Sequence, residues 1–188
     1  MSLMLAPIHY MMWDKILFLD ELVNDLLEFT KDRHINTDYI DDLGIIESGD
    51  LENIIDHSNI HGFLQERVRI VEEKFSATVN LLIKNGVSFN TLEKYMYEYG
   101  EDMSEPVEVD NAHFTLLNFF LDGMPCDRSV MVENTEDKST MTINLDVHAT
   151  FWNDVSDYWK LREAFYRGFL EEAELDLEVI ENRWIISQ

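Results

Sequence analysis

The spacing of apolar residues changes once along the chain, near Pro125. Before this point apolar residues recur every three or four positions, which is typical of amphipathic helices. After it, the segment SVMVENTEDKSTMTINLDVHATF alternates apolar and polar residues, which indicates two strands joined by a turn near Glu136–Lys138. A helical period followed by a β period predicts an α+β fold, in which a helical N-terminal two-thirds packs against a small antiparallel sheet at the C-terminus.

The N-terminal part contains three long helical patterns. The first runs from Tyr10 to about Arg33, the second carries an apolar stripe that ends at Asn85-Gly86, and the third covers residues 90–99. Gly62 could bend or split the second pattern. The acidic segment EDMSEPVEV follows the third and is the best candidate for a boundary. We therefore expect a single domain, residues 1–188, with a possible division into a helical part, 8–100, and an α+β part, 109–188.

The pattern of the C-terminal part predicts two strands, then a helix and then a last strand. Alternation predicts a strand at Thr140–Ala149, and an aromatic-rich pattern capped by Asn153 or Asp154 predicts a helix to about Glu174. The segment LEVIENRWIIS reads as one final strand. The expected sheet therefore has three strands and one covering helix.

The charge of the chain is strongly negative. There are 38 Asp and Glu against 14 Lys and Arg, a net charge of −24. Such a field repels phosphate backbones and anionic lipids, so we expect neither nucleic acid nor membrane as a partner. Acidic surfaces usually serve solubility, and the alternative is recognition of a basic protein, as a DNA mimic or an inhibitor would do.

His57 and His61 are four positions apart where the second helical pattern begins. On a helix both imidazoles would face the same way, so a metal site is one hypothesis, with His113 as a third ligand. A zincin-type protease is excluded, because Ser58, Asn59 and Ile60 stand where its motif needs a glutamate. We expect instead that both histidines are structural and neutral, buried on the stripe that continues through Leu64, Val68, Val71 and Phe75. No cofactor is predicted, and a divalent metal is the alternative.

The helical pattern near residues 151–174 has more aromatic residues than one helix face can hold. The excess must pack on a second surface, which can be the N-terminal helices, the mate in a homodimer or the wall of an apolar ligand pocket. For the pocket, the candidate ligand-binding residues are Trp159, Arg162, Tyr166 and Phe169. Arg162 and Arg167 are the charges best placed to orient an anionic head group.

Catalytic motifs are absent from the sequence. There is no glycine-rich phosphate loop and no Gly-x-Ser-x-Gly elbow, and the lone Cys126 lies beside Arg128 with no recognisable histidine partner. The sequence has no signal segment and one cysteine, so we expect a cytoplasmic protein. We expect a non-enzymatic sensory or regulatory domain that binds an apolar or amphipathic small ligand, with an acidic interaction module as the alternative.

The segment LREAFYRGFLEEAELDLEVIENRWIIS resembles the C-terminal part of 4-vinyl-reductase-type domains and of related vesicle-tethering subunits. In those domains an aromatic helix with a Gly-Phe-Leu step leads into a Val-Glu strand. The matching positions are Tyr166, Gly168, Phe169, Leu170, Glu178, Val179 and Glu181. The resemblance implies binding of a small or hydrophobic ligand in regulation or assembly. Asn182 and Trp184 stand where the family often has cysteines, so the resemblance implies no metal.

Overall fold

The computed structural model describes residues 5–31 and 34–188, and it divides the chain into two compact units. The first unit comprises the residues up to Gly86 together with Asn118–Leu121, and the second comprises Val87–Leu117 and Asp122–Gln188. The chain therefore passes from one unit to the other after Gly86 and on each side of Asn118–Leu121, and not in the acidic segment 101–109. No helix in the described residues is long and apolar enough to cross a membrane.

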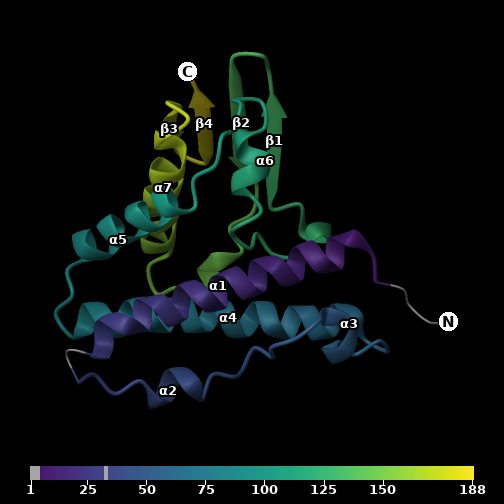
Figure 1. Ribbon diagram of the computed structural model, residues 1–188, viewed down its shortest axis with the longest axis vertical. Coiled ribbons are helices and arrows are strands. Elements are labelled where there is room, and N and C mark those ends of the chain that lie inside the picture. Colours follow the sequence, from purple (N-terminus) through teal and green to yellow (C-terminus); the bar gives the residue numbers. More distant parts are fainter. Residues whose placement is uncertain (1–4, 32–33) are drawn as a thin grey trace. The chain divides into compact units, whose positions relative to one another are not determined.

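The first unit is built on two long helices, α1 (Pro7–Lys31) and α4 (Ile60–Lys84), which run side by side in the same direction (Figure 1). Two short helices, α2 (Asp38–Asp41) and α3 (Leu51–Ile54), lie in the chain that returns from the end of α1 to the start of α4. The stripe predicted for α4 is confirmed from Leu64 onward, and its members Val71, Phe75 and Leu82 are fully buried. The predicted end of the first helix at Arg33 lies outside the described residues.

The helix α4 starts at Ile60 and is continuous through Gly62. Asn59 is its N-cap, and the side-chain oxygen of Asn59 accepts a hydrogen bond from the backbone N–H of Gly62 at 3.2 Å. A Cβ atom on residue 62 would lie 2.2 Å from the Asn59 side chain, so glycine leaves room for the cap. Gly62 therefore does not split the helix.

The second unit contains the sheet and three helices, α5 (Phe89–Asp102), α6 (Ala112–Leu116) and α7 (Val155–Glu171). Its strands are β1 (Val130–Asn134), β2 (Lys138–Ile143), β3 (Asp176–Ile180) and β4 (Arg183–Ser187), and two 3₁₀ turns cover Pro125–Asp127 and His148–Thr150. All pairs are antiparallel and the order is β1-β2-β4-β3. The predicted α+β class, with an antiparallel sheet at the C-terminus, is confirmed.

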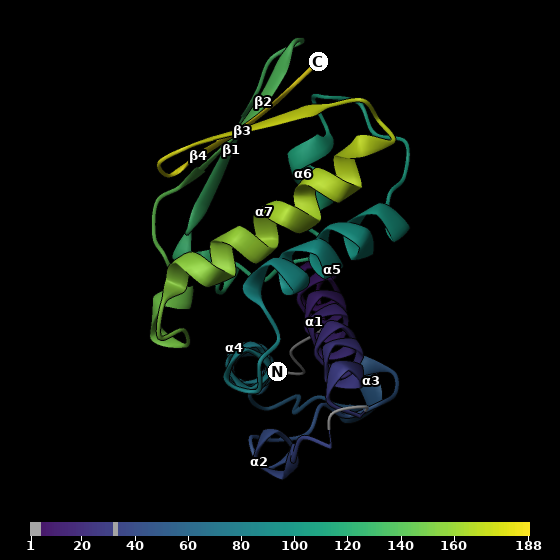
Figure 2. The ribbon, with the colours of Figure 1, turned by 90° about the vertical axis from the view of Figure 1, so that its left-hand side faces the viewer.

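The second unit is built in layers, with helices packed against one face of the sheet. Figure 2 shows α6 and α7 along one face of the twisted sheet, with α5 on the far side of α7. Alternate residues of the strands point to the helices, and they are buried: Met141, Trp184, Ile186 and Leu177. The aromatic excess of α7 is explained by this arrangement, because α7 has the sheet on one side and α5 on the other.

Two strand predictions are wrong in their extent. β2 ends at Ile143, the partner of Val130 at the start of β1, and the chain beyond it turns through a 3₁₀ segment instead of continuing to Ala149. Apolar and polar residues continue to alternate beyond Ile143, but β1 begins at Val130 and pairs with β2 no further. The final segment is a hairpin of two strands, because Glu181 adopts a left-handed conformation (φ 53°) and reverses the chain. The sheet therefore has four strands and not three.

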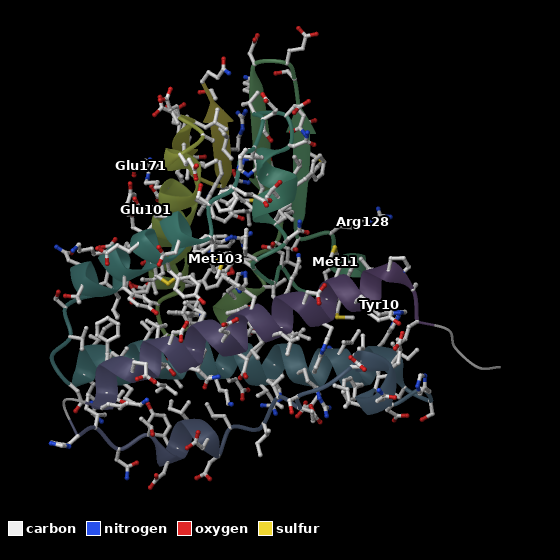
Figure 3. The ribbon with its side chains drawn as sticks, viewed as in Figure 1. Tyr10, Met11, Glu101, Met103, Arg128 and Glu171 are labelled. Atoms are coloured by element: carbon white, nitrogen blue, oxygen red, sulfur yellow. The ribbon has the colours of Figure 1, made fainter. Side chains whose placement is uncertain are left out.

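The helices α5 and α7 approach each other at two glycines. A Cβ atom on Gly168 would lie 1.9 Å from the carbonyl oxygen of Tyr97, and one on Gly100 would lie 2.1 Å from the carbonyl oxygen of Phe165. Neither distance is compatible with a side chain, so the two backbones are in direct contact. Gly168 belongs to the Gly-Phe-Leu step noted in the sequence, and close helix packing is its physical reason. Glu101 and Glu171 lie near the C-terminal ends of α5 and α7 (Figure 3).

Candidate functional site: a groove between α7 and the sheet

The indole of Trp159 is held in place by Asp146. Trp159 lies in the first half of α7, whose N-cap residue Asp154 accepts a hydrogen bond from the backbone N–H of Ser156 at 3.0 Å. The Trp159 Nε1–H donates to the Asp146 Oδ2 atom at 2.9 Å, and the other oxygen of this carboxylate accepts from the backbone N–H of His148 at 3.0 Å. Asp146 therefore fixes the 3₁₀ turn after β2 and the orientation of the half-buried indole together.

Beside this indole is an open groove of about 430 Å³ within the second unit. Its apolar part is formed by Trp159 of α7, Trp184 of β4, Val179 of β3 and Ile143 at the end of β2. The rings of Trp159 and Trp184 meet edge to face, with centroids 5.8 Å apart. Polar side chains surround this apolar part: Asn144, Asp146, Ser156, Lys160, Glu163, Glu181 and Asn182.

The end of the groove is fixed by the β3–β4 turn. The Asn182 side chain donates to the Ile143 carbonyl oxygen at 2.9 Å, and the Ile143 N–H donates to the Asn182 carbonyl oxygen at 2.8 Å. The turn therefore remains attached to the end of β2, and it carries Glu181 to the groove. Sequence reasoning missed Glu181 and Asn182 as site residues because the segment was interpreted as one strand. The Glu-Asn pair lacks the glycine that marks most two-residue hairpin turns.

Behind the groove, α7 contains a buried ion pair. Arg162 is fully buried, and its guanidinium donates to both carboxylate oxygens of Asp122, at 2.7 Å and 3.0 Å. It also donates to the Tyr166 hydroxyl from Nε (3.1 Å) and Nη2 (2.8 Å), and to the Tyr158 hydroxyl at 3.4 Å. The His148 ring stacks on Tyr158, and its Nε2 atom lies 3.9 Å from the Asp122 carboxylate.

The charges of this cluster stabilise one another. Burial raises the pKa of Asp122, but the Arg162 cation and the hydrogen bonds that Arg162 donates outweigh it and hold the pKa well below its usual range. Burial would lower the pKa of Arg162, but Asp122 raises it, so the guanidinium stays charged. Burial raises the pKa of Tyr166 to about 12, which keeps the phenol neutral. The cluster is a structural link between α7 and the segment after α6.

The predicted ligand-binding residues separate into two groups. Trp159 lines the groove, whereas Arg162, Tyr166 and Phe169 are fully buried and do not line it. The guanidinium of Arg162 is engaged by Asp122 and is not available to an anionic head group. Arg167 donates to Glu163 and to the Leu177 carbonyl oxygen, so neither predicted arginine faces a ligand. Spacing along the sequence could not show which face of α7 is turned to the groove.

The expectation of a buried pair at His57 and His61 is wrong. Both residues are exposed, and His57 precedes α4, with its Nε2 atom 3.0 Å from the Glu52 carbonyl oxygen. His61 contacts the ring of His9, with centroids 5.7 Å apart. In the described residues no group of three His, Cys, Asp or Glu gathers to hold a metal ion. Cys126 is exposed in the 3₁₀ turn after α6.

His113 is a buried histidine of the second unit, as is His148. It is fully buried in α6, and its Nε2 atom lies 2.9 Å from the Trp184 carbonyl oxygen. Since a carbonyl only accepts, Nε2 carries the proton, and Nδ1 is a buried acceptor with no hydrogen-bond partner among the described residues. Burial lowers the pKa of His113 to about 4, and the Arg162 cation adds to this effect.

We expect His113 to make the fold sensitive to weak acid. Its pKa in the folded protein is below the value of about 6.5 for an unfolded chain, so the unfolded state binds the proton first. The neutral histidine therefore contributes its full stability above about pH 6.5 and loses it progressively toward pH 4. Between these values the wild-type free energy of unfolding should fall by about 2 to 3 kcal/mol more than that of His113→Gln, which keeps a donor but does not titrate.

Urea unfolding at several pH values measures this difference. The matched control is His57→Gln, the same substitution at an exposed histidine. Equal pH dependence in the wild type and in His113→Gln would contradict the prediction.

Comparison of the chain with family models, with curated protein sequences and with solved structures gives no match.

Proposed function

We propose that the second unit is a non-enzymatic sensory or regulatory domain that binds a small amphipathic ligand in the groove beside Trp159. The observation that supports this most directly is the groove itself, whose apolar centre of two tryptophans, Val179 and Ile143 is surrounded by polar side chains. An apolar centre with a few polar groups is the usual composition of small-molecule sites, and about 430 Å³ lies within their usual range of about 300–1,000 Å³.

The rigidity of the walls supports the same proposal. Asp146 holds Trp159, the Asn182–Ile143 hydrogen bonds hold the turn, and Trp184 is buried in a central strand. A preformed site loses little side-chain entropy when a ligand binds, so more of the contact energy appears as affinity. The implied ligand has a compact aromatic or aliphatic body and a polar group at one end.

The test is native mass spectrometry of the protein after gentle purification. The wild type should retain a small molecule, and Val179→Phe, which adds bulk at the groove without removing a described hydrogen bond, should lose it. Trp159→Ala should lose it too, whereas Phe114→Ala is the matched control because Phe114 is 54% exposed on α6 and does not line the groove.

Three results would count against the proposal. Retention of the molecule by Val179→Phe would place it elsewhere. A protein that emerges empty, yet captures a basic protein in a manner that weakens steeply with salt, would support the acidic interaction module instead. Turnover of any substrate would show that the protein is an enzyme.

A further inference from the structure

We infer that the groove selects an organic cation, that is, an amine or quaternary ammonium group attached to an apolar body. The inference rests on the proposed function and names the chemical class of its ligand. It follows from the aromatic wall together with the charges that face the groove.

Three carboxylates line the groove and each keeps some capacity to accept. Asp146 accepts one hydrogen bond on each oxygen, and a carboxylate has room for about four. Both bonds from Arg167 reach the same oxygen of Glu163, Oε1. Glu181 is exposed in its turn, and no ion-pair partner for it lies among the described residues. These groups come from α7, from the loop after β2 and from the β3–β4 turn, so negative charge lies on several sides of the apolar centre.

The single ammonium group that lines the groove is engaged by residues outside the lining. The Lys160 Nζ atom lies 3.7 Å from the Asp157 carboxylate and 5.4 Å from the centre of the Phe89 ring. Neither Asp157 nor Phe89 lines the groove. The charge of Lys160 is therefore directed to two partners that do not line the groove.

The aromatic wall suits a cation as well. The face of a tryptophan ring attracts a cation through its quadrupole, most strongly where water is partly excluded. Trp159 is half-buried and held by Asp146, and the Arg162 guanidinium already lies 5.4 Å from the centre of its ring. A ligand cation would therefore meet the part of the ring that lines the groove. An anionic ligand would face three carboxylates in a chain of net charge −24.

Binding of three probes to the wild-type chain tests the inference: benzyltrimethylammonium, benzyl alcohol and benzenesulfonate, in about 150 mM salt to screen the general field. The readout is the NMR signal of the Trp159 indole N–H, assigned with Trp159→Phe. Benzyltrimethylammonium should bind about tenfold more tightly than benzyl alcohol, and benzenesulfonate should not bind. The double variant Glu163→Gln/Glu181→Gln should reduce the affinity for the cation about tenfold and leave that for benzyl alcohol unchanged.

A second double variant separates the groove from the net charge. Glu133→Gln/Glu136→Gln removes the same charge from the exposed β1–β2 hairpin and should change the affinity for the cation less than about twofold. An equal loss in both double variants would mean that the cation follows the overall field, which overturns the inference. Tighter binding of benzyl alcohol or benzenesulfonate would overturn the cation class and leave the groove as a ligand site. If no probe shifts the Trp159 signal, the groove proposal fails with it.

Discussion

Replacing Asp122 with asparagine is expected to lower the free energy of unfolding by about 3 to 5 kcal/mol at neutral pH. The substitution keeps the shape of the side chain but leaves the Arg162 guanidinium, which is fully buried, without its countercharge. The hydrogen bonds to the Tyr166 and Tyr158 hydroxyls remain, but neutral oxygens do not replace the carboxylate. Chemical unfolding with urea, followed by tryptophan fluorescence and far-ultraviolet circular dichroism, measures the loss.

A double variant shows that the loss comes from the unpaired charge. Arg162→Met in the Asp122→Asn background removes the buried cation and should recover much of the lost stability, because apolar replacements of buried ion pairs are often close to neutral. The exposed pair Lys94–Glu98 is the control, since Glu98→Gln should cost less than about 1 kcal/mol. A cost below about 1 kcal/mol for Asp122→Asn would show that water reaches the pair.

The same pair predicts a loss of stability in strong acid. The pKa of Asp122 in the folded protein is below its value of about 3.9 in an unfolded chain. The stability that the Asp122 carboxylate contributes is therefore complete above about pH 4 and disappears as the pH falls further. This loss occurs at lower pH than the loss caused by His113.

Gly168→Ala is expected to cost at least about 3 kcal/mol, although alanine is the better helix former by about 1 kcal/mol. The added Cβ atom would lie 1.9 Å from the Tyr97 carbonyl oxygen, so α5 and α7 would have to separate. Gly100→Ala should behave in the same way, because its Cβ atom would meet the Phe165 carbonyl oxygen at 2.1 Å. Thermal and urea unfolding of the full chain provide the measurement.

The control for the glycines is Glu101→Ala, next to Gly100 on α5, which should change stability by less than about 0.5 kcal/mol because the side chain is exposed. Because the two glycines lie at one crossing, the double variant should cost less than the sum of the single costs, since helices already separated by one Cβ atom make room for the second. A neutral or stabilising Gly168→Ala would show that the helices are not in backbone contact.

Local pattern was enough to predict the fold class. A period near 3.6 and a period of 2 follow directly from the geometry of helices and strands, so the stripe through Leu64, Val71 and Phe75 and the helix that contains Trp159 could be recognised from the chain alone. The change of period near Pro125 placed the antiparallel sheet at the C-terminus. The negative net charge could be calculated from the composition alone, because it does not depend on how the chain folds.

Only the tertiary structure decided where strands end and which residues form the site. β2 ends at Ile143 because its partner β1 begins at Val130, and alternation past that point carried no information about pairing. Arg162 and Trp159 are three positions apart on one helix, yet one is buried against Asp122, forty positions earlier, and the other lines the groove. The spacing of His57 and His61 fits one face of a helix, but α4 begins at Ile60, between the two histidines, with Asn59 as its N-cap. Periodicity indicates that a helix has a buried face, but contacts between distant segments decide what covers that face.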